Sequence, residues 1–265
     1  MIKTILYHYR LSPFCRKIRV MLAEKGCLFE LDDENIPVNR LGESPRGEPP
    51  LLIELVEATK KNNTENALEK HFPNTHSDLA MLSDDIEYEE NYIFDHEVIA
   101  EYIEEKYSTP QLMGNNISER AEIRRLCRWF DEKFYSEVGG VIITEKLEKR
   151  LAHTSPDSVR LGKARKNLKD HLFYISHLLR KNDRLLWLVS PNITMADITA
   201  AAHLSVLDYF GEINWNGDTE KNVIDYMLIR DWYARIKSRQ SFKPLLLDRV
   251  MGIPPASTDY SKLDF

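Results

Sequence analysis

LYHYRLSPFCRKIRVMLAEKG, at residues 6–26, is the part of the sequence that points most directly to a fold. Its start predicts a strand at 6–9, SPFC at 12–15 predicts a tight turn, and an amphipathic helix is expected over 16–25. Proline at position 13 suits the first turn of a helix. A hydroxyl or thiol at such a turn lies beside free backbone N–H groups and the positive end of a helix, which together stabilise a thiolate.

A second motif, GEPPLL at 47–52, complements this start. Together the two motifs resemble the thioredoxin-like half of glutathione transferases. The resemblance implies a cis peptide bond before Pro50, a proline that faces the turn in that family, and cis X–Pro bonds are otherwise uncommon. It also implies that Ser12 stands where the family has its catalytic serine or cysteine. Cys15 falls where a redox Cys-x-x-Cys motif has its second cysteine.

Two interpretations stay open for Ser12, and one is favoured for Cys15. The Ser12 hydroxyl could donate to a glutathione thiolate, or it could cap the helix that starts at Pro13. Cys15 is expected to be a small buried apolar residue of that helix. Because position 12 holds no cysteine, no intramolecular dithiol forms, and disulfide oxidoreductase chemistry is not expected.

Composition narrows the class of protein. With 265 residues, of which 43% are hydrophobic and 29% charged, the chain suits a two-domain globular protein. It has no apolar leader and no run of about 18 apolar residues, so neither a secretory signal nor a membrane-inserted helix is expected. Three scattered cysteines and dispersed histidines predict a reducing cytoplasm and no metal site. The net charge of -6 argues against nucleic-acid binding.

The negative charge is concentrated between two strand-like runs. Residues 56–91 contain nine acidic residues and three lysines, so their net charge equals that of the whole chain. The resemblance to glutathione transferases implies that the flanking runs at 51–55 and 92–94 pair as a hairpin, and hairpin loops usually take about two to five residues. We therefore interpret 56–91 as an insertion, with one helical turn near 65–70. It is either a solvated loop or an acidic surface for a basic partner.

Helical periodicity dominates the rest of the chain. One helix is expected over 120–137, ending near Gly139-Gly140; a second is expected over 160–181, and a third opens at Thr194. The expected fold is an α/β thioredoxin-like N-terminal domain followed by an all-α C-terminal domain, the glutathione transferase fold. The domains and connecting segments are expected at 1–107, with the insertion inside it, then a linker at 108–117, an all-helical domain at 118–250 and an extended C-terminal tail at 251–265.

Thr194 and Asp197 are expected to form a capping box at the start of the third helix. In such a box the first side chain bonds a backbone N–H one turn on, and the second reaches back, although the second residue is usually Glu or Gln. The Asp197 carboxylate also suits the positive helix end. The family resemblance places a Ser/Thr-x-x-Asp box here, at the start of a buried central helix. Both residues are therefore interpreted as structural.

The glutathione site of the family is only partly matched. Pro49 and Pro50 supply its backbone element, and Asp95-His96 stands where the family has an acid followed by a serine. Asp95 could be that acid or a helix N-cap. The His96 imidazole is bulkier than a hydroxymethyl group and offers no compact donor in the same space, which argues against strong glutathione binding. Three basic residues of the first helix flank this site and are expected on its exposed face: Arg16, Lys17 and Arg19.

The chain ends in a segment that cannot continue a helix. Residues 251–265 contain GIPP and several small polar residues, and they end in Leu263, Asp264 and Phe265. Such anchors on an extended segment suit docking on another protein, although the tail could instead pack on its own domain. The SPFxRK turn, the GIPP stretch and the terminal LDF together resemble the FtsZ-localised division proteins of alphaproteobacteria (the FzlA group).

That resemblance implies a role in cell division. Members of the group bind filaments of the tubulin-like FtsZ through the folded body, usually as homodimers, and promote constriction. Their tail links to septal cell-wall synthesis proteins, and they are not known for glutathione chemistry. The resemblance therefore implies FtsZ and septal proteins as partners, a cytoplasmic place at the division site and no cofactor. The alternative is a cytosolic glutathione transferase that conjugates glutathione to small electrophiles, with Ser12 as the catalytic residue.

Overall fold

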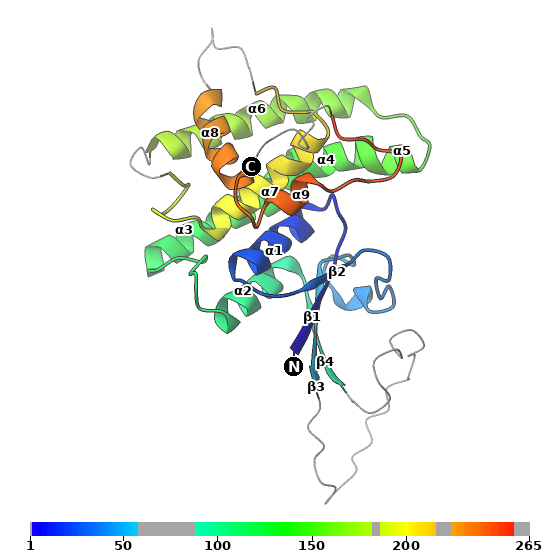
Figure 1. The fold of residues 1–265 in the computed structure, drawn as a ribbon. Helices are drawn as coiled ribbons and strands as arrows, with labels where there is room; N and C mark the ends of the chain where they lie inside the picture. Colours follow the sequence, from blue (N-terminus) through cyan, green and yellow to red (C-terminus); the bar gives the residue numbers. More distant parts are fainter. Residues whose placement is uncertain (1, 58–87, 182–185, 216–223, 257–265) are drawn as a thin grey trace, which may run out of the picture.

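The computed structural model describes residues 2–57, 88–181, 186–215 and 224–256. A small sheet with the N terminus at its foot lies below a larger helical layer, and helix α1 (Pro13–Glu24) lies where the two meet (Figure 1). This confirms the predicted order of a thioredoxin-like α/β part followed by an all-helical part. None of the described helices is both long and apolar enough to pass through a bilayer.

One mixed sheet is formed by the strands of the described residues, in the order β2-β1-β3-β4. The pair β1·β2 is parallel, and the pairs β1·β3 and β3·β4 are antiparallel. The strands span Ile2–Tyr7 (β1), Glu30–Asp32 (β2), Leu51–Glu57 (β3) and Tyr88–Phe94 (β4). The first strand thus ends at Tyr7 instead of continuing to residue 9, because the chain turns toward α1 after the last β1·β2 pair.

Alternate residues of the sheet pack into two different apolar clusters. Leu6 pairs with Leu52, and Leu52 with Ile93, and all three belong to the main core that continues into the helices. Ile5 and Ile53 pair on the opposite face, in a smaller cluster. Successive side chains of a strand point to opposite faces, so this register places one apolar stripe against the helices.

The β3–β4 hairpin extends further than the sequence predicted. Val56 pairs with Glu89 and Glu57 with Tyr88, so the ends of the expected insertion at 56–91 are strand. The prediction was wrong there because polarity was taken as a loop signal, whereas an antiparallel strand with one solvated face accepts acidic side chains. The remainder of that insertion, including the helical turn expected near 65–70, lies outside the described residues.

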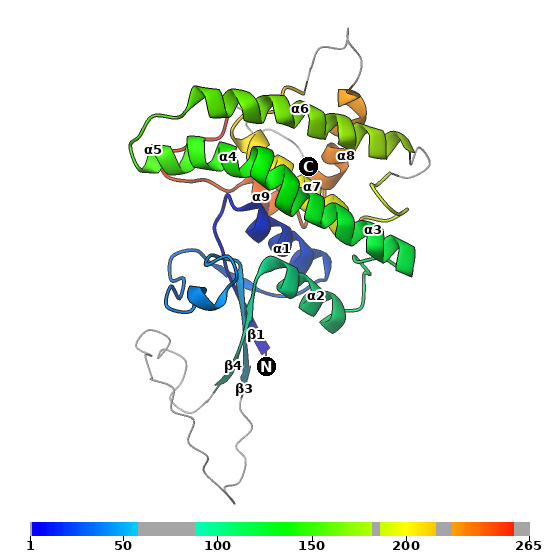
Figure 2. The same ribbon diagram turned by 180° about the vertical axis from the view of Figure 1, so that it is seen from behind.

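The helical layer is built on one long helical rod. It comprises α3 (Ile117–Arg128), the π-helical segment η2 (Trp129–Gly139), α4 (Gly140–Ile143), η3 (Thr144–Glu148) and α5 (Lys149–Leu151). Figure 2 shows α6 (Ser158–Lys181) lying alongside this rod. The other helical segments are α2 (His96–Lys106), α7 (Met195–Tyr209), α8 (Tyr226–Lys237), α9 (Lys243–Leu246) and the single turn η1 (Leu41–Glu43).

The rod does not end at the glycine pair, so that prediction was wrong. Gly139 and Gly140 have helical φ angles of -58° and -62°. Gly140 permits close packing, because a Cβ there would lie 3.1 Å from the Tyr135 ring, whereas a Cβ on Gly139 would make only ordinary contacts, such as 3.7 Å to His203 Nδ1. Glycine lowers helix propensity by about 1 kcal/mol, which helix–helix packing can override.

Candidate functional site

A cleft of about 600 Å³ lies beside the first turn of α1, between the sheet layer and the helical layer. Ser12 lines it and caps α1, because its Oγ accepts the Cys15 N–H at 3.4 Å. The cap function satisfies one of the free N–H groups of the helix. The other walls come from the helical rod and from the chain after α9, and include Tyr135, Leu147 and Met251.

Cys15 is fully buried behind this turn, which confirms it as a small core residue. Its Sγ accepts the Tyr9 N–H at 3.3 Å. Burial raises the pKa of the Cys15 thiol to about 11, and the hydrogen bond from Ser12 opposes that effect only in part. For the Cys15 thiol, desolvation therefore outweighs the positive helix end.

The peptide bond between Pro49 and Pro50 is cis, as the resemblance implied. Both prolines are buried, and Pro50 directly precedes β3. Neither residue lines the Ser12 cleft, and neither do Asp95 and His96. Of the residues predicted for glutathione binding and catalysis, the structure therefore places only Ser12 on the open cleft.

Asp95 and His96 begin α2 in different roles. Asp95 is the N-cap, with its carboxylate accepting the Glu97 N–H at 2.8 Å and a left-handed φ of 72°. Such a φ is uncommon for residues other than glycine, although aspartate tolerates it better than most. His96 is 3% exposed and stacks on Phe14 with 4.6 Å between ring centroids. The imidazole thus fills the core beside α1.

The same Phe14 ring also carries an arginine. The Arg46 guanidinium lies 3.8 Å from the Phe14 centroid and 5.5 Å from that of Tyr135. Tyr135 packs edge-on against Phe14 at 4.7 Å. This cation–π arrangement ties the loop before Pro49 to the helical rod, and such contacts contribute about 0.5–2 kcal/mol each.

A buried charge cluster lies under His96, and it was not foreseen from the sequence. Lys17 Nζ donates to Asp131 Oδ2 at 2.5 Å, and His203 Nε2 lies 3.1 Å from Asp131 Oδ1. His96 Nδ1 lies 3.9 Å from Asp131 Oδ2. The cluster joins α1, α2, η2 and α7, and its members are too far apart in sequence for any spacing signal. The sequence offered only weak signals for it, namely Lys17 on α1 and Asp131 within an apolar helical segment.

Burial sets the protonation of this cluster. Burial, followed by the charge of Lys17, lowers the pKa of His96 to about 3. Burial also lowers the pKa of His203, although Asp131 opposes it. For Asp131, burial alone would raise the pKa, but Lys17 and the His203 hydrogen bond outweigh it and the pKa falls. These shifts favour an ionised Asp131 carboxylate and neutral His96 and His203 imidazoles at neutral pH.

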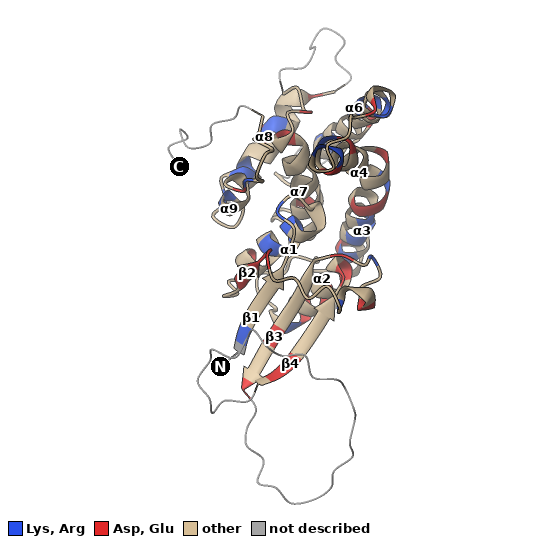
Figure 3. Ribbon diagram, turned by 90° about the vertical axis from the view of Figure 1, so that its right-hand side faces the viewer, with Lys and Arg blue, Asp and Glu red and all other residues tan. Residues whose placement is uncertain are grey.

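The basic residues of α1 are not on an exposed face, so that prediction was wrong. Arg16, Lys17 and Arg19 are 1%, 2% and 5% exposed. Arg19 contacts Asp248 Oδ2 at 2.8 Å, and Arg16 contacts the same oxygen at 3.3 Å. Figure 3 shows these basic positions where α1 meets the helical layer. Helical periodicity assigns a charged face to solvent, but here the helical layer covers that face with its own acids.

The capping box at α7 has the expected geometry and two further bonds. Asp197 Oδ2 accepts the Thr194 N–H at 3.0 Å and the Thr194 hydroxyl at 2.8 Å. Its other oxygen accepts the Leu188 N–H at 2.8 Å and Trp232 Nε1–H at 3.0 Å. Asp197 thus links α7, α8 and the preceding loop. A local motif predicts the box but not the Trp232 bond.

The first part of the expected tail packs on the body. Ile253 is buried, its carbonyl accepts the Tyr209 hydroxyl at 2.5 Å, and Ala256 N–H donates to the Tyr209 carbonyl at 2.8 Å. Gly211, with φ 66°, makes room, because a Cβ there would lie 2.6 Å from that of Ala256. An extended tail starting at 251 is thus wrong for 251–256. Leu263, Asp264 and Phe265 lie outside the described residues.

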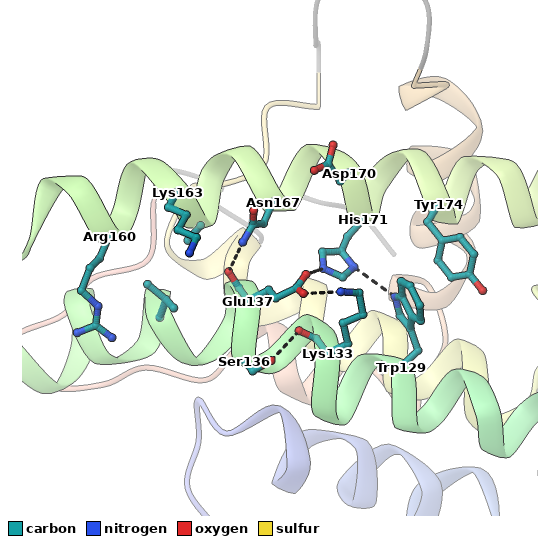
Figure 4. Close-up of a pocket in the computed structure, with 12 residues that line it drawn as sticks. Trp129, Lys133, Ser136, Glu137, Arg160, Lys163, Asn167, Asp170, His171 and Tyr174 are labelled. Atoms are coloured by element: carbon teal, nitrogen blue, oxygen red, sulfur yellow. Dashed lines mark hydrogen bonds and ion pairs between the residues drawn. The ribbon is translucent and has the colours of Figure 1, made fainter.

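A second, open groove of about 740 Å³ lies between η2 and α6 (Figure 4). Some of its polar groups bind one another: His171 accepts Trp129 Nε1–H at 3.2 Å and lies 2.9 Å from Glu137 Oε2, and Lys133 pairs with the same Glu137. Asn167 donates to the Glu137 carbonyl at 3.2 Å. Arg160, Lys163 and Asp170 also line the groove, so it presents charged side chains beside these paired groups.

Comparison with known proteins places the chain in a family. It is 36% identical over 268 residues to FtsZ-localized protein A of Caulobacter vibrioides, covering 100% of this chain and 99% of that protein. It also matches the structure of FzlA from C. crescentus, with 35% identity, a TM-score of 0.76 and coverage of 99% and 100%. The chain belongs to the FzlA family of glutathione transferase-like proteins. No family model matches it.

Other solved structures agree with the glutathione transferase-like fold of the FzlA-family chain. A glutathione S-transferase from Rhodospirillum rubrum is 37% identical, with a TM-score of 0.73 and 96% coverage of both chains. Another from Sinorhizobium meliloti is 30% identical, with a TM-score of 0.74 and coverage of 99% and 100%. The relatives of the FzlA-family chain therefore include proteins described as transferases.

Proposed function

We propose that this FzlA-family chain is a non-catalytic protein of the glutathione transferase fold that binds FtsZ filaments and promotes bacterial cell division. The observation that carries the proposal is the 36% identity, along its whole length, to a protein named for its localisation with FtsZ. The match covers both the sheet layer and the helical layer. The shared feature is thus the whole chain, and its folded body is the part that we expect to meet the filament.

Three features of the site support a non-catalytic role. His96 is stacked on Phe14 inside the core, where the family's acid–serine pair would leave a hydroxyl. Asp95 is engaged as a helix cap. Ser12 is the N-cap of α1, so its oxygen serves the fold by accepting a backbone N–H, while its O–H keeps the capacity to donate. Together these contacts use the predicted glutathione-binding groups for folding.

Co-sedimentation tests the proposal. The full chain is mixed with FtsZ that has been assembled with GTP, and FtsZ without nucleotide serves as the control. We expect the chain to pellet with the polymers and to stay in the supernatant with unassembled FtsZ. A chain that stays in the supernatant in both cases would contradict the proposal.

A second candidate function is glutathione conjugation to small electrophiles. It is favoured by Ser12 on the lip of a 600 Å³ cleft and by the 37% identity to a protein described as a glutathione S-transferase. The test is retention on immobilised glutathione, with His96→Ser as the variant that regains a small hydroxyl. We expect the wild type to pass through and His96→Ser to be held back. Retention of the wild type, with conjugation lost in Ser12→Ala, favours the transferase instead.

We also infer a homodimer, with the groove between η2 and α6 covered by a second copy (Figure 4). The end of the β3–β4 hairpin carries Glu57, Glu89 and Glu90, while Lys163 on α6 lines the groove. This charge complementarity suits contact between the sheet of one copy and the groove of the other. Light scattering should give a dimer mass that falls in Lys163→Glu. The control is Lys166→Glu, an exposed lysine of α6 outside the groove lining.

The tail partner and the location complete the proposal. We infer that the chain acts in the cytoplasm at the division site and that Leu263, Asp264 and Phe265 contact a septal cell-wall synthesis protein. Support comes from the seating of 251–256 on Tyr209, which fixes where the tail leaves the body. A fluorescent fusion lacking 257–265 should still reach the division site but no longer promote constriction. Loss of localisation in that fusion contradicts this division of roles.

A further inference from the structure

Three side chains with metal-binding atoms meet at the N-terminal end of α2. The ligand atoms of His96, Glu97 and Asp131 all lie within 4.8 Å of one another. His96 and Glu97 are the first two residues of α2, whereas Asp131 belongs to η2 in the helical layer. The cluster therefore forms only when the two layers pack against each other, and no spacing of residues in the sequence predicts it.

The free ring nitrogen of His96 points to a ligand. His96 is 3% exposed, and its Nδ1 has no hydrogen-bond partner among the described residues. A buried polar atom without a partner costs free energy, which a bound ligand would recover. Its neighbour Asp131 Oδ2 is 3.9 Å away, beyond hydrogen-bond distance. A metal ion about 2 Å from each ligand atom spans a gap of about 4 Å.

The three groups also have the surroundings that metal ligands need. Asp131 Oδ1 is held by His203 Nε2 at 3.1 Å, the kind of outer bond that orients a carboxylate ligand. The His96 ring is fixed by its stack on Phe14. Glu97 is exposed, so it forms the solvent side of the cluster and gives an ion a path from solvent.

We propose that His96, Glu97 and Asp131 form a binding site for a divalent transition-metal ion of the Zn²⁺ type. One imidazole nitrogen with two carboxylate oxygens is a ligand set that suits zinc, with water completing the coordination. The site differs from the expectation of no metal site, which was drawn from sequence spacing alone. It lies apart from the Ser12 cleft, which none of the three residues lines.

Lys17 limits the affinity of this site. Its ammonium already contacts Asp131 Oδ2 at 2.5 Å, and two cations beside one carboxylate repel each other. A carboxylate oxygen can accept more than one partner, so both fit only with reduced attraction. The ion therefore binds more weakly than in a closed four-ligand structural zinc site.

Titration calorimetry with zinc chloride tests the proposal on the full chain. The deciding variant is Glu97→Gln, because Glu97 is exposed and its replacement leaves the core intact. The matched control is Glu105→Gln, an exposed glutamate of the same helix with the same change of charge. His96→Phe is a second variant that keeps a ring on Phe14 but removes the ligand nitrogen.

The wild type and Glu105→Gln are expected to bind one Zn²⁺ per chain, and their melting temperatures should rise with zinc. In Glu97→Gln the dissociation constant should rise about tenfold or more, and His96→Phe should show no site of this kind. Absence of zinc binding in the wild type overturns the proposal. So does equal binding by Glu97→Gln, since zinc would then be held elsewhere, for example by cysteine.

Discussion

The Lys17 ammonium donates a 2.5 Å hydrogen bond to the Asp131 carboxylate, with both side chains 2% exposed. Lys17 belongs to α1 and Asp131 to η2, so this one ion pair connects the sheet layer to the helical rod. Breaking a buried pair by removing one partner leaves a buried charge alone, at a cost of about 3–5 kcal/mol. Two layers joined in this way are expected to unfold together.

Lys17→Met should therefore lower the free energy of unfolding by about 3–5 kcal/mol. Chemical denaturation followed by circular dichroism measures the change. In the double variant Lys17→Met/Asp131→Leu, which leaves no lone charge, most of the loss should be recovered. A single variant as stable as the wild type would show that the pair does not hold the layers together.

Asp197→Ala should destabilise the chain more than Thr194→Ala. The Asp197 carboxylate accepts hydrogen bonds from Leu188, Trp232 and Thr194. Its removal leaves several buried donors without a partner, which costs about 1–3 kcal/mol for each group. Thr194→Ala removes one cap, at about 1 kcal/mol. Urea unfolding of both variants gives the comparison. Equal losses would mean that Asp197 acts only as half of a capping box.

Acid should destabilise the fold through His96. Burial lowers its folded-state pKa to about 3 from an ordinary value of 6.5, so the unfolded chain takes up the proton first. The stability from neutral His96 is fully present above pH 6.5 and is lost as pH falls toward 3, with a slope of up to about 1.4 kcal/mol per pH unit. His96→Phe should flatten that slope, and exposed His177→Phe should not. An unchanged slope in His96→Phe contradicts the assignment.

The fold was predictable where its signals are local. The SPFC turn, the proline pair before β3 and the box at Thr194 each depend on a few neighbouring residues, and each has the predicted geometry. Such signals show how the polar groups of a segment's own backbone are hydrogen-bonded. The rest of the fold changes this little. They identify the fold class, but they do not report what a segment packs against.

The predictions that failed depend on that packing. Arg16, Lys17 and Arg19 repeat along α1 like a solvent-facing stripe. They are nevertheless buried, because Asp131 of η2 and Asp248, two residues beyond α9, meet them. Gly139 and Gly140 look like a helix end, yet the helix continues through them and the Tyr135 ring packs closely against Gly140. For the basic residues a partner distant in sequence decides the outcome, and a single sequence does not reveal which residues will be partners.

Tyr209→Phe should loosen the base of the tail. The Tyr209 hydroxyl donates to the Ile253 carbonyl and accepts the Val250 N–H at 3.3 Å, and its loss leaves these buried groups unpaired, at about 1–3 kcal/mol. Hydrogen exchange of the backbone amides over 250–256 should become faster. The control is Tyr226→Phe, a half-buried tyrosine on α8. Unchanged exchange in Tyr209→Phe would place the anchor of this segment elsewhere, for example in the buried Ile253 side chain.

The central claim is that the folded body of this FzlA-family chain carries the FtsZ contact. Co-sedimentation of chain 1–256 with GTP-assembled FtsZ, measured beside the full chain over a range of FtsZ concentrations, tests it most directly. Truncation after Ala256 keeps the segment that is seated on Tyr209 and removes 257–265. We predict the same half-maximal FtsZ concentration for both chains. Binding that disappears with 257–265 would contradict the account, because the filament contact would then lie in the tail.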